Sequence, residues 1–266
     1  MYTEKLPLAG LPNTRDLGGM PAKNGTIRPH RLIRSGLLGH AASESLAWLT
    51  DVCGMHTVVD FRTKAELADK PDPVLPGVRA VHVPILRSLT NGISRENEGQ
   101  TPIAQLTQEI HDMGLTAEQF MANLYISMVC DAHAQQHYAR FFDILLDSPS
   151  GATLWHCSVG KDRVGMGTAM LQIALGVAMD DVMDDYLATQ KNVQAFIDRD
   201  CAIVEQQTGD PRAAETVRAL NGVMPSYLTS SFAQMEKLCG SVDAYLAEKI
   251  GLTPEKCARL QEMYIG

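Results

Sequence analysis

The feature that most constrains the fold is a short, mostly apolar run that ends at a cysteine and is followed closely by a helix. Residues 151–156 lead into Cys157, and Arg163 lies six positions further on. Beyond Arg163 apolar residues recur at three- and four-residue spacing, which places on one helix face Met166, Met170, Ile173 and Ala174. The pattern predicts a strand, a tight loop over residues 157–163 and a helix, an arrangement typical of α/β proteins.

The rest of the chain first alternates strand and helix patterns and then becomes helical. The turn dipeptides Gly18-Gly19 and Asn24-Gly25 predict a hairpin that leads into a strand over residues 32–35. Hydrophobic spacing predicts further strands over residues 57–61 and 78–84, and helices over residues 42–53, 63–69 and 116–147. We therefore expect an α/β fold.

No repeat, low-complexity tract or long linker divides the chain. Its 266 residues, 45% of them apolar, suffice for one substantial core, so we predict a single domain over residues 1–266. Residues 88–108 are polar and predict a loop, and one interpretation makes residues 88–147 a helical lid. Residues 180–266 predict several amphipathic helices, with breaks at Thr208–Pro211 and at Gly251.

The loop after the strand has the composition of an anion site. Main-chain N–H groups of a curled loop, together with a helix N-terminus, offer donors and positive potential to a phosphate. Gly160 lets the chain turn tightly, and we assign phosphate binding to Ser158, Val159, Gly160 and Lys161. The same potential favours the thiolate of Cys157, which is the nucleophilic form. We therefore expect Cys157 to attack phosphorus.

Two further side chains of the loop complete the predicted chemistry. The planar guanidinium of Arg163 binds two phosphoryl oxygens at once, and this pairing strengthens as charge spreads over the equatorial oxygens in the transition state. The leaving oxygen needs a proton, and Asp162 lies where its carboxyl group can face that oxygen. We assign Asp162 as the general acid. The alternative is a charge pair of Lys161 and Asp162 at a helix start, without a catalytic role.

The loop His156-Cys157-x-x-Gly160-Lys161-Asp162-Arg163-x-Gly165 resembles the signature of the bacterial cysteine-dependent tyrosine and lipid phosphatases, which a secreted mycobacterial enzyme typifies. The resemblance spans nearly the whole chain, through residues 13–19, 34–36, 59–63 and 240–246. It implies a protein tyrosine phosphatase-like fold, with a central, mostly parallel sheet flanked by helices, and no metal or other cofactor. It also implies that the loop aspartate is the acid, in agreement with the role of Asp162.

The resemblance also indicates what the protein acts on. It implies hydrolysis of phosphotyrosine through a phosphocysteine intermediate, with phosphoinositides and phosphoserine or phosphothreonine as secondary substrates. The partners that we expect are therefore a phosphorylated protein or phosphoinositide as substrate and inorganic phosphate at the loop.

One position departs from the family pattern. The residue after the arginine is commonly Thr or Ser in such loops, where a hydroxyl stabilises the departing thiolate during phosphocysteine hydrolysis, but here it is Val164. We predict a slower second step unless the hydroxyl of Ser158 or Thr168 substitutes. The same departure favours an alternative interpretation, a phosphate-binding module that does not turn over. The intact set of cysteine, aspartate and arginine favours the enzyme.

Other site classes fit less well. A sulfur-transfer enzyme of the rhodanese type also uses a loop cysteine, but its loop would not need the acid and the two cations found here. A nucleotide P-loop is excluded, because Trp155 stands where its first glycine is required and Asp162 where Ser or Thr should follow the lysine. His133 and His137 lack the glutamate and the third ligand of a zinc site.

Several polar residues remain open to two interpretations. His156 either forms a hydrogen bond near the thiolate or fills the strand end. Four charged residues near strand ends either orient the loop or cap turns: Arg15, Asp16, Asp60 and Arg62. The acidic group Asp180, Asp181, Asp184 and Asp185 lacks the spacing of a calcium loop, so we interpret it as a solvated helix start.

Charge and cysteine usage bound the partners and the compartment. Lys and Arg number 23 against 31 Asp and Glu, a net charge of −8 that argues against nucleic acid and anionic membranes as partners. We find no signal peptide pattern and no integral membrane segment. The six cysteines are scattered singly, without the CxxC pairs of metal sites. We expect a cytoplasmic protein with reduced thiols, and we leave open export that needs no cleavable signal.

Overall fold

A computed structural model describes residues 4–88, 103–148 and 151–266. Its central five-stranded sheet has the order β1-β4-β7-β5-β6. The strands are β1 (Arg15–Asp16), β4 (Leu32–Ser35), β5 (Thr57–Asp60), β6 (Arg79–His82) and β7 (Thr153–His156). The edge strand β1 pairs antiparallel with β4, and the other three pairings are parallel. The predicted α/β fold with a mostly parallel sheet is confirmed. The predicted hairpin is the small pair β2 (Pro21–Ala22) and β3 (Gly25–Thr26).

The helices follow most of the predicted ranges. Those before the loop over residues 157–163 are α1 (Ser43–Ala47), its π-helical continuation η1 (Trp48–Val52), α2 (Lys64–Asp69), α3 (Ile103–Asp112), α4 (Ala117–Cys130) and α5 (Ala132–Leu146). Those after it are α6 (Asp162–Ala174), α7 (Met179–Thr208), α8 (Pro211–Asn221), α9 (Pro225–Cys239), α10 (Val242–Glu248) and α11 (Pro254–Tyr264).

Helix α3 overturns part of one expectation. A loop was predicted over residues 88–108, but from Ile103 the chain is helical. Leu106 and Ile110, four residues apart, are buried in the main core, so their burial stabilises a helix in a segment whose composition is otherwise polar. Residues 89–102 of the predicted loop lie outside the described residues.

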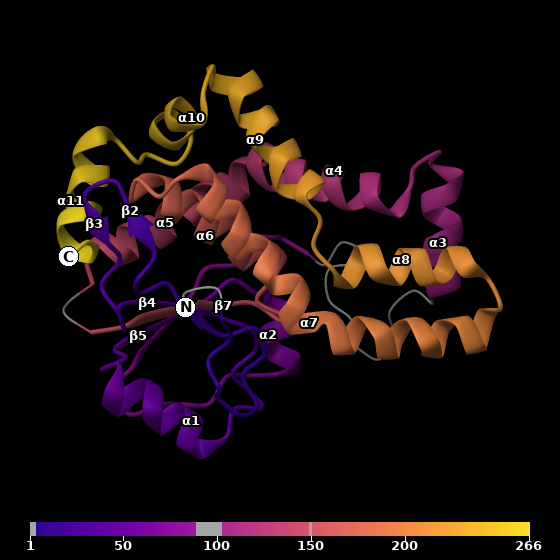
Figure 1. The fold of residues 1–266 in the computed structure, drawn as a ribbon, viewed down its shortest axis with the longest axis horizontal. Helices are drawn as coiled ribbons and strands as arrows, with labels where there is room; N and C mark the ends of the chain where they lie inside the picture. Colours follow the sequence, from indigo (N-terminus) through magenta and orange to yellow (C-terminus); the bar gives the residue numbers. More distant parts are fainter. Residues whose placement is uncertain (1–3, 89–102, 149–150) are drawn as a thin grey trace.

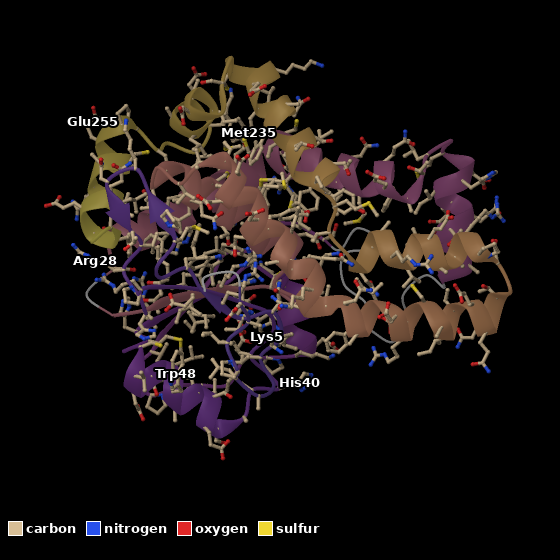
Figure 2. All side chains as sticks on the ribbon, in the orientation of Figure 1. Lys5, Arg28, His40, Trp48, Met235 and Glu255 are labelled. Carbon is tan, nitrogen blue, oxygen red and sulfur yellow. The ribbon has the colours of Figure 1, made fainter. Side chains whose placement is uncertain are left out.

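The sheet separates two apolar layers, because successive side chains of a strand point to opposite faces. Leu154 and Val58 point into a smaller cluster beneath α1, whereas Trp155 and Val59 point into the large core beneath the later helices. Figure 1 shows α1 on one side of the sheet and α5, α6 and α11 on the other. Figure 2 labels Trp48 and Met235, which lie in these two layers.

The C-terminal helices are divided at the predicted breaks. Gly209 ends the 30-residue helix α7 with a φ of 64°, and the Asp210 side chain accepts a hydrogen bond from the Arg212 N–H to begin α8. Gly251 separates α10 from α11. Helices α7 and α8 pack side by side and extend away from the sheet (Figure 1). In the part of the chain that the structure describes, no helix is long and apolar enough to cross a bilayer.

Candidate active site

The predicted loop lies at the carboxyl end of the central strand β7. Ser35, Asp60 and His156 are in register, so the ends of three parallel strands are level there. Cys157 follows His156, and α6 begins at Asp162. Gly160 has a φ of 72°, and a Cβ atom on it would lie 2.6 Å from the carbonyl oxygen of Ser35. Only glycine fits this turn, as the sequence predicted.

The carbonyl groups of the loop are held from outside. The Ser158 oxygen accepts from the Leu37 N–H at 3.1 Å. The Gly160 oxygen accepts from the Asn13 amide at 2.8 Å and from the Arg34 guanidinium at 3.0 Å. The main-chain N–H groups of Ser158, Val159 and Gly160 have no hydrogen-bond partner among the described residues. The loop therefore keeps donors for an anion at the N-terminus of α6.

A buried carboxylate behind the loop explains how Arg34 is held. Asp185 accepts from Arg34 at 2.7 Å, from Arg15 at 3.0 Å and from Gln172 at 3.1 Å. Burial opposes the charge of Asp185, but the two arginines lower its pKa below the usual range. The prediction of a solvated helix start is therefore wrong for Asp185, which faces inward one turn and a half after α7 begins. For Arg15 the structure favours support of the loop.

The other charged residues at strand ends have local partners. Asp16 caps a turn, because it accepts from the N–H groups of Gly18 at 2.9 Å and His30 at 2.8 Å. Asp60 accepts hydrogen bonds from the Arg62 side chain, whose Nε reaches both carboxylate oxygens at 2.9 and 3.1 Å and whose Nη2 reaches one at 2.8 Å, and it accepts one more from the Arg62 main chain.

His156 lies against Asp72, a residue that the sequence did not single out. Its Nε2 atom is 2.9 Å from Asp72 and 3.8 Å from Asp60. These three residues form a candidate metal-binding group in the described part of the chain. Arg62 Nη2 lies 2.8 Å from Asp60 and 2.9 Å from Asp72, so a guanidinium is already paired with both carboxylates. The geometry therefore indicates a charge cluster that supports the strand end. The other ring nitrogen of His156, Nδ1, lies 3.4 Å from the carbonyl oxygen of Cys157, so both interpretations of His156 stay open.

Arg163 is fixed by a partner that the sequence analysis missed. Its two terminal nitrogens donate to Glu66 at 2.7 and 2.9 Å, and the Ser158 hydroxyl donates to the same carboxylate at 2.6 Å. Burial opposes the charge of Glu66, but Arg163 and Ser158 lower its pKa well below the usual range. The available signal was the spacing Thr63-x-x-Glu66, a capping box that begins α2.

The remaining edge of the Arg163 guanidinium has no protein partner. Its Nε atom is buried without a hydrogen bond in the described residues, and the side chain is 1% exposed. Burial opposes its charge, but the neighbouring Cys157, Glu66 and Asp162 together raise its pKa above the usual value. A guanidinium held end-on by Glu66 can thus offer its Nε edge to phosphoryl oxygens.

Asp162 and Lys161 are both buried at the end of the loop that begins with Cys157. Asp162 accepts from the Tyr125 hydroxyl at 2.8 Å and lies 3.5 Å from the Lys161 ammonium. Lys161 also donates to the carbonyl oxygen of Leu220 in α8. The structure therefore brings together all three predicted catalytic residues, but it turns the Lys161 ammonium toward α8.

Helices α7 and α8 lie over the loop. The side chain of Val159 packs against a cluster that both helices form, namely Val193, Ile197, Cys201, Val204, Ala213, Ala214 and Val217. Cys157 is 2% exposed and Asp162 is 3% exposed. Both helices lie outside the segment 88–147 that was predicted as a lid, and residues 89–102 of that segment lie outside the described residues.

Neither predicted substitute for the missing hydroxyl is free. Thr168 donates to the carbonyl oxygen of Val164 at 2.7 Å and accepts from the Trp155 indole at 3.1 Å. Ser158 donates to Glu66 at 2.6 Å. The predicted slow second step therefore keeps its physical basis.

The histidines rejected as zinc ligands also have other contacts. His133 forms a 2.9 Å hydrogen bond to the carbonyl oxygen of Pro84, and its ring lies 3.9 Å from that of His137. These contacts hold α5 to the segment after β6.

A thiol, a carboxyl group and a guanidinium thus converge with unpaired main-chain amides at the start of one helix. This site, on a mostly parallel sheet flanked by helices, is typical of α/β phosphatases.

Comparison with known proteins places the chain within that class. It matches the tyrosine phosphatase family over residues 6–266. It is 30% identical over 244 residues to a Cupriavidus necator protein provisionally named a tyrosine-protein phosphatase, covering 90% of this chain and 81% of the relative. It is 26% identical over 293 aligned residues to the triple specificity protein phosphatase PtpB of Mycobacterium tuberculosis, covering 100% of both. The chain belongs to the tyrosine phosphatase family and is a phosphatase, which confirms the predicted family, fold and enzyme class.

Proposed function

We propose that this phosphatase hydrolyses phosphotyrosine in proteins through a covalent phosphocysteine on Cys157. The proposal is carried by one observation: a single loop and helix start hold Cys157, Asp162 and Arg163 together with main-chain N–H groups that have no partner among the described residues. The carbonyl oxygens of Ser158 and Gly160 accept hydrogen bonds from outside the loop, which leaves those N–H groups available to an anion. A phosphoryl group held there would meet donors on its equatorial oxygens and the sulfur on its axis.

The first step would transfer the phosphoryl group to sulfur. The Cys157 thiolate attacks phosphorus, the S–P bond forms and the bond from phosphorus to the leaving oxygen breaks. Asp162 gives its proton to that oxygen, so a neutral alcohol or phenol departs. Arg163 and the loop amides bind the three equatorial oxygens throughout.

The second step would release phosphate. Water attacks phosphorus, Asp162, now a carboxylate, accepts a proton from that water, and the S–P bond breaks to restore the thiolate. Inorganic phosphate leaves from the loop. Because Val164 offers no hydroxyl to the departing thiolate, this step is slow.

Tyrosine phosphopeptides are the favoured substrate, since two relatives are named tyrosine or triple specificity phosphatases. Phosphoinositides and phosphoserine or phosphothreonine are proposed as secondary substrates of the same site. We also propose a cytoplasmic location, because the described residues form no disulfide bond, as a reducing compartment would maintain.

The test is release of phosphate from an aryl phosphate, a tyrosine phosphopeptide and a phosphoinositide. Cys157→Ser and Arg163→Ala should each lose at least about a thousandfold in kcat/KM, because each removes a group that acts in the transition state. Asp162→Asn should slow poor leaving groups far more than good ones. Full activity of Cys157→Ser would reject the phosphocysteine route.

Val164, together with the engaged hydroxyls of Thr168 and Ser158, favours a second candidate, a phosphate-binding module without turnover. Binding of inorganic phosphate by the wild-type protein, with no release from any of the three substrates, would select it.

A further inference from the structure

The two carboxylate oxygens of Asp162 have different surroundings. Oδ1 accepts the Tyr125 hydroxyl at 2.8 Å, and the Lys161 ammonium lies 3.5 Å from the same atom. No hydrogen bond from the described residues reaches Oδ2. The two oxygens of the same acid are therefore not equivalent.

Tyr125 is fully buried on α4, and its hydroxyl accepts one hydrogen bond and donates another. The Tyr186 hydroxyl, from α7, donates to the Tyr125 oxygen at 2.9 Å, so the Tyr125 hydrogen is left for Asp162. Burial, and after it the charge of Asp162, raises the pKa of Tyr125 well above its usual value. Tyr125 thus remains a protonated donor and does not itself serve as the acid.

We propose that Tyr125, held by Tyr186, is a positioning residue that divides the tasks of the Asp162 carboxyl group. Oδ1 is anchored by Tyr125 and Lys161, and Oδ2 carries the proton that is delivered to the leaving oxygen. A proton on Oδ1 would face two donors, whereas on Oδ2 it meets none from the described residues. The proposal rests on the proposed function, in which Asp162 is the general acid.

The arrangement has a consequence for specificity. A phenol leaves more readily than an alkyl alcohol, so alkyl phosphates such as phosphoserine and phosphoinositides depend most on a well-placed acid. Tyr125 should therefore matter little for activated aryl phosphates and much for alkyl phosphates. It would help determine whether the enzyme accepts substrates other than phosphotyrosine.

The test is kcat/KM of Tyr125→Phe for aryl phosphates whose leaving groups range from nitrophenol to phenol. This parameter reports cleavage of the substrate even if phosphocysteine hydrolysis limits kcat. Loss of one hydrogen bond to the carboxylate that forms as Asp162 gives up its proton should slow phenyl phosphate by at least about tenfold and nitrophenyl phosphate by less than about twofold. Tyr264→Phe is the matched control, because its buried hydroxyl donates to the Leu145 carbonyl at 2.8 Å, in the α5 and α11 packing.

Two further variants separate this idea from a structural effect. Tyr186→Phe keeps the Tyr125 hydroxyl and should give a smaller change in the same direction; it decides the matter alone if Tyr125→Phe does not fold. In an Asp162→Asn background, Tyr125→Phe should lose its dependence on the leaving group.

The failures are distinguishable. Equal slowing of all leaving groups, no slowing, or a dependence that persists in the Asp162→Asn background would overturn the role of Tyr125 while the wild-type enzyme still turned over. Absence of turnover by the wild-type protein would instead remove the proposed function.

Discussion

Val164 is the residue at which this loop differs from its family's usual pattern, and its surroundings define what a substitution would do. It is fully buried beside the loop at the first turn of α6, one position after Arg163. Valine and threonine have nearly the same shape, so a threonine would place a hydroxyl there with little change in packing.

Val164→Thr should therefore accelerate hydrolysis of phosphocysteine by about tenfold, because a hydrogen bond to a departing thiolate contributes roughly 1.5 kcal/mol. Acid quenching during turnover measures the fraction of enzyme held as phosphocysteine, and this fraction should fall. Val164→Ala, which adds no hydroxyl, is the control. An unchanged fraction in Val164→Thr would mean that the hydroxyl binds elsewhere or that the second step is not slow.

Helix α2 is an element that serves the site through its first turn. Thr63 and Glu66 form its capping box, and the same Glu66 carboxylate holds Arg163 and Ser158. The helix is only six residues long, so its start and the loop depend on each other.

Glu66→Gln keeps the shape of the cap but removes the charge that faces Arg163. We expect it to lower the free energy of unfolding by about 3 kcal/mol, since it leaves a buried cation without its anion. Phosphate binding should weaken as well, because the guanidinium loses its fixed orientation. Urea unfolding and calorimetric titration with phosphate measure the two effects. The control is Glu44→Gln, which removes an exposed acid from the first turn of α1 and should change neither stability nor phosphate binding. A Glu66→Gln protein as stable as wild type would contradict the ion pair between Glu66 and Arg163.

How much the sequence could predict depends on how far apart the partners lie in the chain. The loop was predictable because strand end, Gly160, Cys157 and Arg163 are contiguous. Asp185 was not, because its partner Arg15 is 170 positions away and only the fold brings them together. Tyr125 was not predictable either, because its contact with Asp162 depends on how α4 packs against α6.

At the scale of the whole molecule, α7 joins two parts of the structure. Its first turns carry Asp185 and Tyr186, which support the loop and the acid from behind. Its later turns pack with α8 over Val159, in front of the loop. A movement of α7 would therefore change both its packing over Val159 and the hydrogen bonds of Asp185 and Tyr186 that support the loop and Asp162.

The buried carboxylates make the whole fold sensitive to acid. The pKa values of Glu66, Asp60 and Asp185 are all lowered in the folded state. Burial alone would raise each pKa, but the charged partners of each carboxylate outweigh burial. These partners are Arg163 for Glu66, His156 and Arg62 for Asp60, and Arg15 and Arg34 for Asp185. In the unfolded chain such groups titrate near pH 4, so below that value the unfolded state binds more protons. The stability that these groups contribute is thus fully present above pH about 5, begins to be lost below pH about 4, and continues to be lost until the pH reaches each group's lowered pKa in the folded state.

The free energy of unfolding should then fall by as much as roughly 1.4 kcal/mol per pH unit for each such group once the pH is well below 4. Asp185→Asn should be less stable than wild type at pH 7, because Arg15 and Arg34 lose their shared anion, but its stability should depend less steeply on pH by about that amount. Urea unfolding at several pH values between 3 and 7 gives both slopes. Because Asp180 begins the same helix but is exposed, Asp180→Asn should keep the wild-type slope. If the free energy of unfolding depended on pH equally steeply in Asp185→Asn and wild type, Asp185 would not be charged in the folded protein. Contacts other than Asp185 would then hold Arg34 against Gly160.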